Sequence, residues 1–99
     1  MINNYSTIKF KKSLAPVFDK YGIRRAVLFG SYAKGATNEK SDVDLLVDSG
    51  LRGLKFISLR EDISRILKRE VDLFDVTHIE KNSQIDKEIA ATGVVIHEK

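Results

Sequence analysis

The sequence predicts an α/β or α+β sandwich, in which a small mixed sheet is flanked by helices, and two observations support this. Apolar residues recur at helical spacing in three segments, and four short apolar runs alternate with those segments. The expected order is helix, strand, strand, helix, strand, helix, strand, which suits one layered core. No repeat or linker interrupts this order, so we expect a single domain over residues 1–99.

The first predicted helix covers residues 7–21 and contains Pro16. It either kinks at this proline or begins so late that the proline lies in its first turn. The second helix, 54–68, is amphipathic, with its apolar residues on one face. A third carries isoleucines at 79, 85 and 89, and Gly93 stops it.

The predicted strands are Ala26–Phe29, Asp42–Asp48, Val71–Val76 and Val94–Ile96. The first is a continuous apolar run, which is typical of a buried strand. The second alternates polar and apolar residues, so one of its faces is expected to be buried. We expect the third strand to lie in the interior of the sheet.

The composition limits the classes of partner. Net charge is +3, the sequence pI is about 9.2, and the basic residues are spread along the chain without stacking aromatics, so we expect no direct nucleic-acid partner. The chain has no cysteine, which excludes disulfides and thiolate metal sites. No apolar run could cross a membrane and the polar start is no signal peptide, so we expect a cytoplasmic protein. Its short length favours a partner or an oligomer, homomeric or heteromeric.

A pair of carboxylates, Asp42 and Asp44, stands at the start of the second predicted strand. Residues two apart on a strand point to the same side of the sheet. Two adjacent carboxylates repel each other unless a cation lies between them, and Mg²⁺ takes oxygen ligands while keeping positions for substrate phosphates. The pair therefore suggests a metal site, although solvated strand-end residues would give the same pattern.

Gly30 and Ser31 follow the first predicted strand directly. A glycine lets the backbone approach an anionic ligand closely, and exposed amides at the start of a helical turn attract phosphate. Lys34 lies in the same loop and could contact a phosphate or simply face solvent. The segment is interpreted as a phosphate-binding turn, although hairpin turns use the same residues.

A third carboxylate is expected on the third strand, where Asp72 and Asp75 compete for the role. Asp72 lies between apolar residues, and a carboxylate is costly to bury unless it is paired or bound to metal. Asp75 precedes a predicted turn, where aspartate is common for local reasons. We prefer Asp72 on this ground.

Together these residues resemble the signature of the polymerase-beta-like nucleotidyltransferase superfamily. The match comprises a strand followed by Gly30-Ser31, a short spacer, Asp42-Val43-Asp44, and a carboxylate on a later strand. The short chain, and the segment 20–23 before the first strand, are similar to the minimal nucleotidyltransferase (MNT) branch of this superfamily.

The resemblance implies a fold, a cofactor and roles for six residues. ATP would be the substrate, and two Mg²⁺ ions would carry the triphosphate and activate the attacking hydroxyl. Asp72 would complete the second metal site or act as general base. The implied catalytic and metal-binding residues are Asp42, Asp44 and Asp72, and the implied nucleotide-binding residues are Gly30, Ser31 and Lys34.

The same resemblance implies a partner. MNT proteins are paired with a helical ribonuclease toxin of the HEPN class (higher eukaryotes and prokaryotes nucleotide-binding). The chain would transfer AMP to a hydroxyl, most simply a tyrosine, of that toxin and silence it, as a type VII-like antitoxin. One alternative is a non-catalytic antitoxin that neutralises its toxin by binding. Another is a small-molecule nucleotidyltransferase of the aminoglycoside type, which would need an acidic pocket for a polycation. The sequence favours it less, because Glu61, Asp62 and Glu70 lie on or beside a helix and not around the site.

Overall fold

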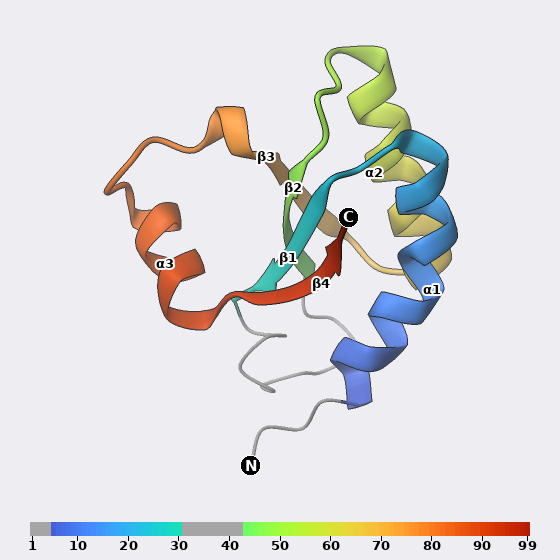
Figure 1. Ribbon diagram of the computed structural model, residues 1–99, viewed down its shortest axis with the longest axis horizontal. Helices are drawn as coiled ribbons and strands as arrows, with labels where there is room; N and C mark the ends of the chain where they lie inside the picture. Colours follow the sequence, from blue (N-terminus) through green and yellow to red (C-terminus); the bar gives the residue numbers. More distant parts are fainter. Residues whose placement is uncertain (1–4, 31–42) are drawn as a thin grey trace.

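The computed structural model describes residues 5–30 and 43–99, and within them the chain folds as a mixed sheet with helices on both faces (Figure 1). This is the predicted α+β sandwich. The elements are α1 (Tyr5–Tyr21), β1 (Arg25–Phe29), β2 (Val43–Asp48), α2 (Leu54–Leu67), β3 (Val71–Asp75), the 3-10 helix η1 (Val76–His78), α3 (Gln84–Thr92) and β4 (Val94–Glu98).

The four strands of the described sheet have the spatial order β3-β2-β1-β4. β1 pairs antiparallel with both β2 and β4, whereas β2 and β3 are parallel. A parallel pair needs a crossover connection, and α2 supplies it. β3 therefore lies at an edge of the sheet, so the prediction that it lies in the interior was wrong.

Helices α1 and α2 pack side by side against one face of the sheet and enclose the main core (Figure 1). The two helices contribute Phe10, Leu14, Val17, Phe18, Leu59 and Ile63, and the facing sheet residues include Ala26, Leu28, Val43, Leu45, Val47, Val71 and Leu73. The alternation of buried and half-buried residues along β2 confirms that only one of its faces lies in this core.

Pro16 lies inside α1, which runs on both sides of it. A proline in a helix interior removes one hydrogen bond and costs about 3 kcal/mol or more. Apolar side chains on both sides of it, including Leu14 and Phe18, are fully buried, and their burial offsets that cost. Of the two possibilities, the structure therefore contradicts a helix that begins just before the proline.

Helix α3 lies on the opposite face of the sheet and contacts β1 (Figure 1). Ser83 caps its N-terminus by accepting a hydrogen bond from the amide of Asp86, at 3.2 Å. At its other end a side chain at Gly93 would overlap Val27 and the carbonyl of Ile89, so only glycine fits there. None of the described helices is both long and apolar enough to span a bilayer.

Candidate active site

Two of the predicted site carboxylates lie side by side on adjacent strands. Asp44 of β2 and Asp72 of β3 are register partners in the parallel pair. Their neighbours Val43 and Val71 are also register partners and are fully buried in the core. Because successive side chains alternate between the two faces, both carboxylates point to the face away from that core. Asp44 is half-buried and Asp72 is exposed.

The position of Asp72 depends on how α2 leads into β3. Arg60 of α2 donates from Nε to the carbonyl of Val71 at 3.1 Å, and Ser64 donates from Oγ to the carbonyl of Arg69 at 2.5 Å. The backbone amide of Val43 donates to the carbonyl of Glu70 at 3.0 Å. These bonds fix where β3 starts relative to β2, and so fix which residue lies opposite Asp44.

Gly30 ends β1 beside the same carboxylate. β1 pairs with β2 so that Phe29 lies opposite Asp44, and Gly30 follows with φ +77°. A Cβ at this position would overlap the carboxylate of Asp44. Glycine is therefore needed twice, for its backbone conformation and for the space that Asp44 occupies.

Helix α3 holds this turn in place. The amide of Gly30 donates to Oγ1 of Thr92 at 3.0 Å, and Thr92 in turn donates to the carbonyl of Glu88 at 2.8 Å. The last turn of α3 thus anchors the end of β1. Thr92 could not be predicted from the sequence, because a threonine in the last turn of a helix belongs to no known site motif.

Asp75, the rival third carboxylate, has a structural role. It is 2% exposed, and its side chain points to the core side of the sheet. Oδ1 accepts hydrogen bonds from the amide and Oγ of Ser49 at 3.0 and 2.6 Å, and Oδ2 accepts from the amide and Oγ1 of Thr77 at 3.1 and 2.8 Å. It thereby caps η1 and joins the end of β2 to the end of β3.

Burial raises the pKa of Asp75, and the hydrogen bonds from Ser49 and Thr77 outweigh that effect, so the pKa is lowered overall. Asp72 was preferred because it was expected to be buried. That expectation was wrong, since Asp75 is the buried carboxylate and Asp72 is exposed. The strand register gives the better reason to prefer Asp72, because it alone of the two shares a face with Asp44.

Asp42, Ser31 and Lys34 lie outside the described residues, and their assignments stay predictions. Neither histidine has a partner His, Cys or carboxylate at ligand spacing in the sequence, which predicts ordinary surface positions for both. His97 is instead half-buried: its ring stacks on Phe18 with centroids 4.9 Å apart, and Nε2 lies 3.0 Å from the carbonyl of Ile23. His78 is exposed, and its Nδ1 accepts a hydrogen bond from the amide of Asp75 at 3.1 Å.

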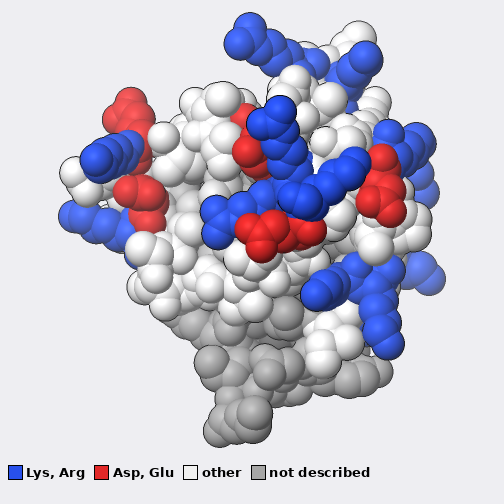
Figure 2. Space-filling model, in the orientation of Figure 1, with Lys and Arg blue, Asp and Glu red and all other residues white. Residues whose placement is uncertain are grey.

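Charge is mixed over the face of the molecule that Figure 2 shows. Lys and Arg side chains alternate there with Asp and Glu instead of forming one basic tract. Among the described residues, Arg65 and Asp62 form an ion pair at 2.9 Å.

The arrangement suits a polyphosphate held together with a hard cation. Two carboxylates on neighbouring strands offer oxygen ligands, and the tight turn at Gly30 brings backbone beside one of them. Carboxylate oxygens are the donors that Mg²⁺ takes in sites that also bind substrate phosphates. The donor set among the described residues therefore fits that ion.

A pair of carboxylates on adjacent strands beside a glycine turn, on a small mixed sheet, is the arrangement expected of a nucleotidyltransferase. The family model described as polymerase beta, nucleotidyltransferase matches residues 12–99. The chain belongs to this family.

Among its sequence relatives are proteins named as protein adenylyltransferases. A putative protein adenylyltransferase of Methanocaldococcus jannaschii is 34% identical over 73 residues, which cover 72% of this chain and 78% of the relative. The protein adenylyltransferase MntA of Thermococcus cleftensis is 44% identical over 59 residues, covering 56% of this chain and 58% of that protein.

Solved structures confirm the fold. A toxin–antitoxin crystal structure with AMP-PNP aligns at a TM-score of 0.76 with 19% identity, covering 90% of this chain and 73% of the other. The MNT antitoxin complexed with a tri-AMPylated HEPN toxin of Shewanella oneidensis aligns at 0.67 with 16% identity, over 94% and 73% of the two chains.

Proposed function

We propose that this chain transfers AMP from ATP to a hydroxyl of a HEPN-class toxin and thereby acts as its antitoxin. The pairing of Asp44 with Asp72 beside Gly30 carries the proposal, because this is the arrangement that nucleotidyl transfer requires. The names of the relatives support it, since they are protein adenylyltransferases. The solved complex with an AMPylated HEPN toxin supplies the acceptor class.

In the proposed reaction the acceptor oxygen attacks the α-phosphorus of ATP, the bond to the β-phosphate breaks, and pyrophosphate leaves. Asp72 receives the proton of the acceptor hydroxyl as the general base, or it would help to hold the second Mg²⁺. Gly30 lets the backbone approach the β- and γ-phosphates closely, and Ser31 with Lys34 holds them. Most of the rate gain then comes from positioning and from charge stabilisation.

Asp42, Asp44 and Asp72 would hold Mg²⁺. Without cations these carboxylates would repel a nucleoside triphosphate. When bound, Mg²⁺ would neutralise charge on the phosphates and lower the pKa of the attacking hydroxyl. We place the reaction in the cytoplasm, where ATP and a ribonuclease toxin would both be present.

An isotope experiment tests the proposal. The chain is incubated with Mg²⁺ and a HEPN toxin from the same organism, with ATP labelled at either the α- or the γ-phosphate. Label from the α-phosphate alone should enter the toxin, and it should remain on a tyrosine after tryptic digestion. Entry of γ-label would indicate a kinase instead. Inhibition of the toxin without any label would favour the non-catalytic antitoxin.

Replacing Gly30 by alanine should impair AMP transfer. The new Cβ would overlap the carboxylate of Asp44, and a displacement of about 1 Å in a catalytic group can cost roughly 10²-fold in rate. Initial rates of label transfer at saturating ATP, together with a melting curve, measure the effect.

Gly22→Ala is the matched control for this substitution. Gly22 has a similar φ, +68°, but a Cβ there meets nothing within 4 Å. Both variants should lose about 1 kcal/mol of stability from the backbone conformation. Equal activity of the two variants would show that the space beside Asp44 does not matter.

Metal and nucleotide should stabilise the folded chain. Mg²⁺ with ATP binds only the native site, so mass action should raise the melting temperature by roughly 10–20 °C at ligand concentrations about 100 times Kd. Asp44→Asn should abolish this rise, whereas Asp48→Asn, at the far end of the same strand, should keep it. An equal rise in both variants would place the ligand elsewhere.

A further inference from the structure

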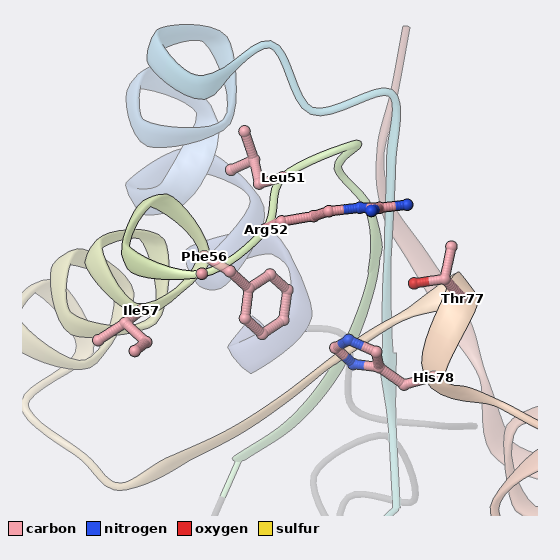
Figure 3. Close-up of a pocket in the computed structure, with 7 residues that line it drawn as sticks. Leu51, Arg52, Phe56, Ile57, Thr77 and His78 are labelled. Carbon is pink, nitrogen blue, oxygen red and sulfur yellow. The ribbon is translucent and has the colours of Figure 1, made fainter.

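A hollow lies at the opposite end of the strands from the carboxylates. It is about 430 Å³ in volume and is formed by the loop after β2, the start of α2 and the helix η1 (Figure 3). The rings of Phe56 and His78 meet edge to face within it, with centroids 5.2 Å apart. Arg52 extends across from the loop toward Thr77 (Figure 3).

Two polar side chains of this hollow, Arg52 and His78, can donate hydrogen bonds, whereas the hydroxyl of Thr77 already donates to Asp75. Arg52 is cationic and exposed, and within the described residues it forms no ion pair. Nδ1 of His78 accepts a hydrogen bond from a backbone amide, so the neutral ring carries its proton on Nε2. Residues 49–60 include three cations and no acidic residue. The hollow is therefore electrostatically complementary to a carboxylate.

The surface beside the hollow is apolar. Leu54 and Ile57 are 81% and 51% exposed, and they lie three residues apart on α2, so they share one side of the helix. Figure 1 places the start of α2 at one end of the molecule. At that end, Figure 2 shows Lys and Arg side chains (blue) next to residues that carry no charge (white). A nucleotide inside the hollow would leave Leu54 uncovered, whereas a protein segment would cover both residues.

The hollow is held in shape by buried hydrogen bonds. Asp75 joins Ser49 to Thr77, and Ser49 Oγ accepts a hydrogen bond from the amide of Leu51 at 3.0 Å. Both walls are therefore tied to one buried carboxylate. Such preorganisation lowers the entropic cost of binding.

We propose that this hollow, with Leu54 and Ile57, docks the toxin through a segment in which an acidic residue adjoins a large apolar side chain. The inference rests on the proposed function, which supplies the toxin. The carboxylate of the segment would pair with Arg52, and the apolar side chain would cover Phe56 and Ile57. Asp44 and Asp48 mark the two ends of β2, about 13 Å apart at 3.3 Å per residue, so docking and transfer use separate surfaces. Docking there would hold the acceptor hydroxyl near Asp44 and raise its effective concentration.

Affinity for the unmodified HEPN toxin tests the proposal by titration calorimetry with purified proteins. Leu54→Glu with Ile57→Glu should weaken binding by about 30-fold or more, and Arg52→Glu by about 10-fold. The KM for the toxin should rise by similar factors while kcat at saturating toxin stays unchanged. Ile8→Glu and Ile66→Glu, which alter exposed apolar residues outside the hollow, should bind as the wild type does.

The outcomes separate the two proposals. If the wild-type chain and the variants of the hollow bind the toxin equally, docking at this hollow is wrong and AMP transfer is unaffected. If binding depends on the hollow but no AMP is transferred, the proposed activity is wrong and the docking surface is supported. If the wild-type chain does not bind the toxin, both are overturned. Melting curves check that each variant is folded.

Discussion

Asp44→Asn should reduce the rate of AMP transfer by at least about 10³-fold, equivalent to roughly 4 kcal/mol of transition-state stabilisation. Asn keeps the size of the side chain but removes the charge and one oxygen ligand. The carboxylate is half-buried, paired in register with Asp72 and packed beside Gly30, so its neighbours fix its position. Initial rates with α-labelled ATP and the HEPN toxin measure the loss.

Asp48→Asn provides the control, because Asp48 lies on the same strand and the same face as Asp44. Its activity should stay within about threefold of the wild type, since surface changes away from a site have small effects. A large loss in both variants would trace the effect to the strand as a whole. Full activity of Asp44→Asn would remove this residue from the mechanism.

Asp75→Asn should destabilise the fold strongly. The amide cannot accept all four hydrogen bonds that the carboxylate receives from Ser49 and Thr77, and its NH₂ would face donors. Leaving buried donors unsatisfied costs about 2–4 kcal/mol, which lowers the melting temperature of a chain of this size by roughly 10–20 °C. Thermal unfolding followed by circular dichroism measures it.

Asp72→Asn is the matched comparison for Asp75→Asn. Asp72 is exposed, so its melting temperature should stay close to that of the wild type, while AMP transfer should fall steeply. The two aspartates of β3 would then separate catalysis from stability. The reverse pattern, with Asp72→Asn unstable and Asp75→Asn inactive but stable, would contradict the assignment.

Acid should also destabilise the wild-type chain, because it protonates Asp75. The folded-state pKa of Asp75 lies below its unfolded value, so its stabilisation is present above the unfolded pKa, near 4. It is lost as the pH falls through the folded-state pKa. Asp75→Asn should therefore show a smaller loss of stability than the wild type on acidification below about pH 4. Denaturant titrations between pH 6 and pH 3 would test this sign.

The helices and strands could be predicted from the sequence because their apolar periodicity is local. The continuity of α1 through Pro16 could not, since it depends on core contacts made on both sides of the proline. The edge position of β3 was missed for a similar reason. The packing of the whole sheet decides which strands pair, so the residues 71–75 alone do not indicate that β3 lies at an edge.

The candidate site divides in the same way. The carboxylates and the glycine turn were found because one motif combines them, whereas Thr92 and Ser49 act through hydrogen bonds that no sequence motif indicates. The difference between Asp72 and Asp75 was visible in principle. Val71 and Leu73 are core residues of β3, so strict alternation places Asp75 on their side and Asp72 on the other.

Intact-mass measurement of the HEPN partner tests AMP transfer directly. The partner is incubated with ATP, Mg²⁺ and this chain, and its mass is then compared with that of the untreated protein. The wild-type chain should add one or more AMP units to the toxin, and Asp44→Asn should add none. An unchanged toxin mass with the wild-type chain, in a complex where the toxin is bound and inhibited, would contradict AMP transfer and leave an antitoxin that acts by binding.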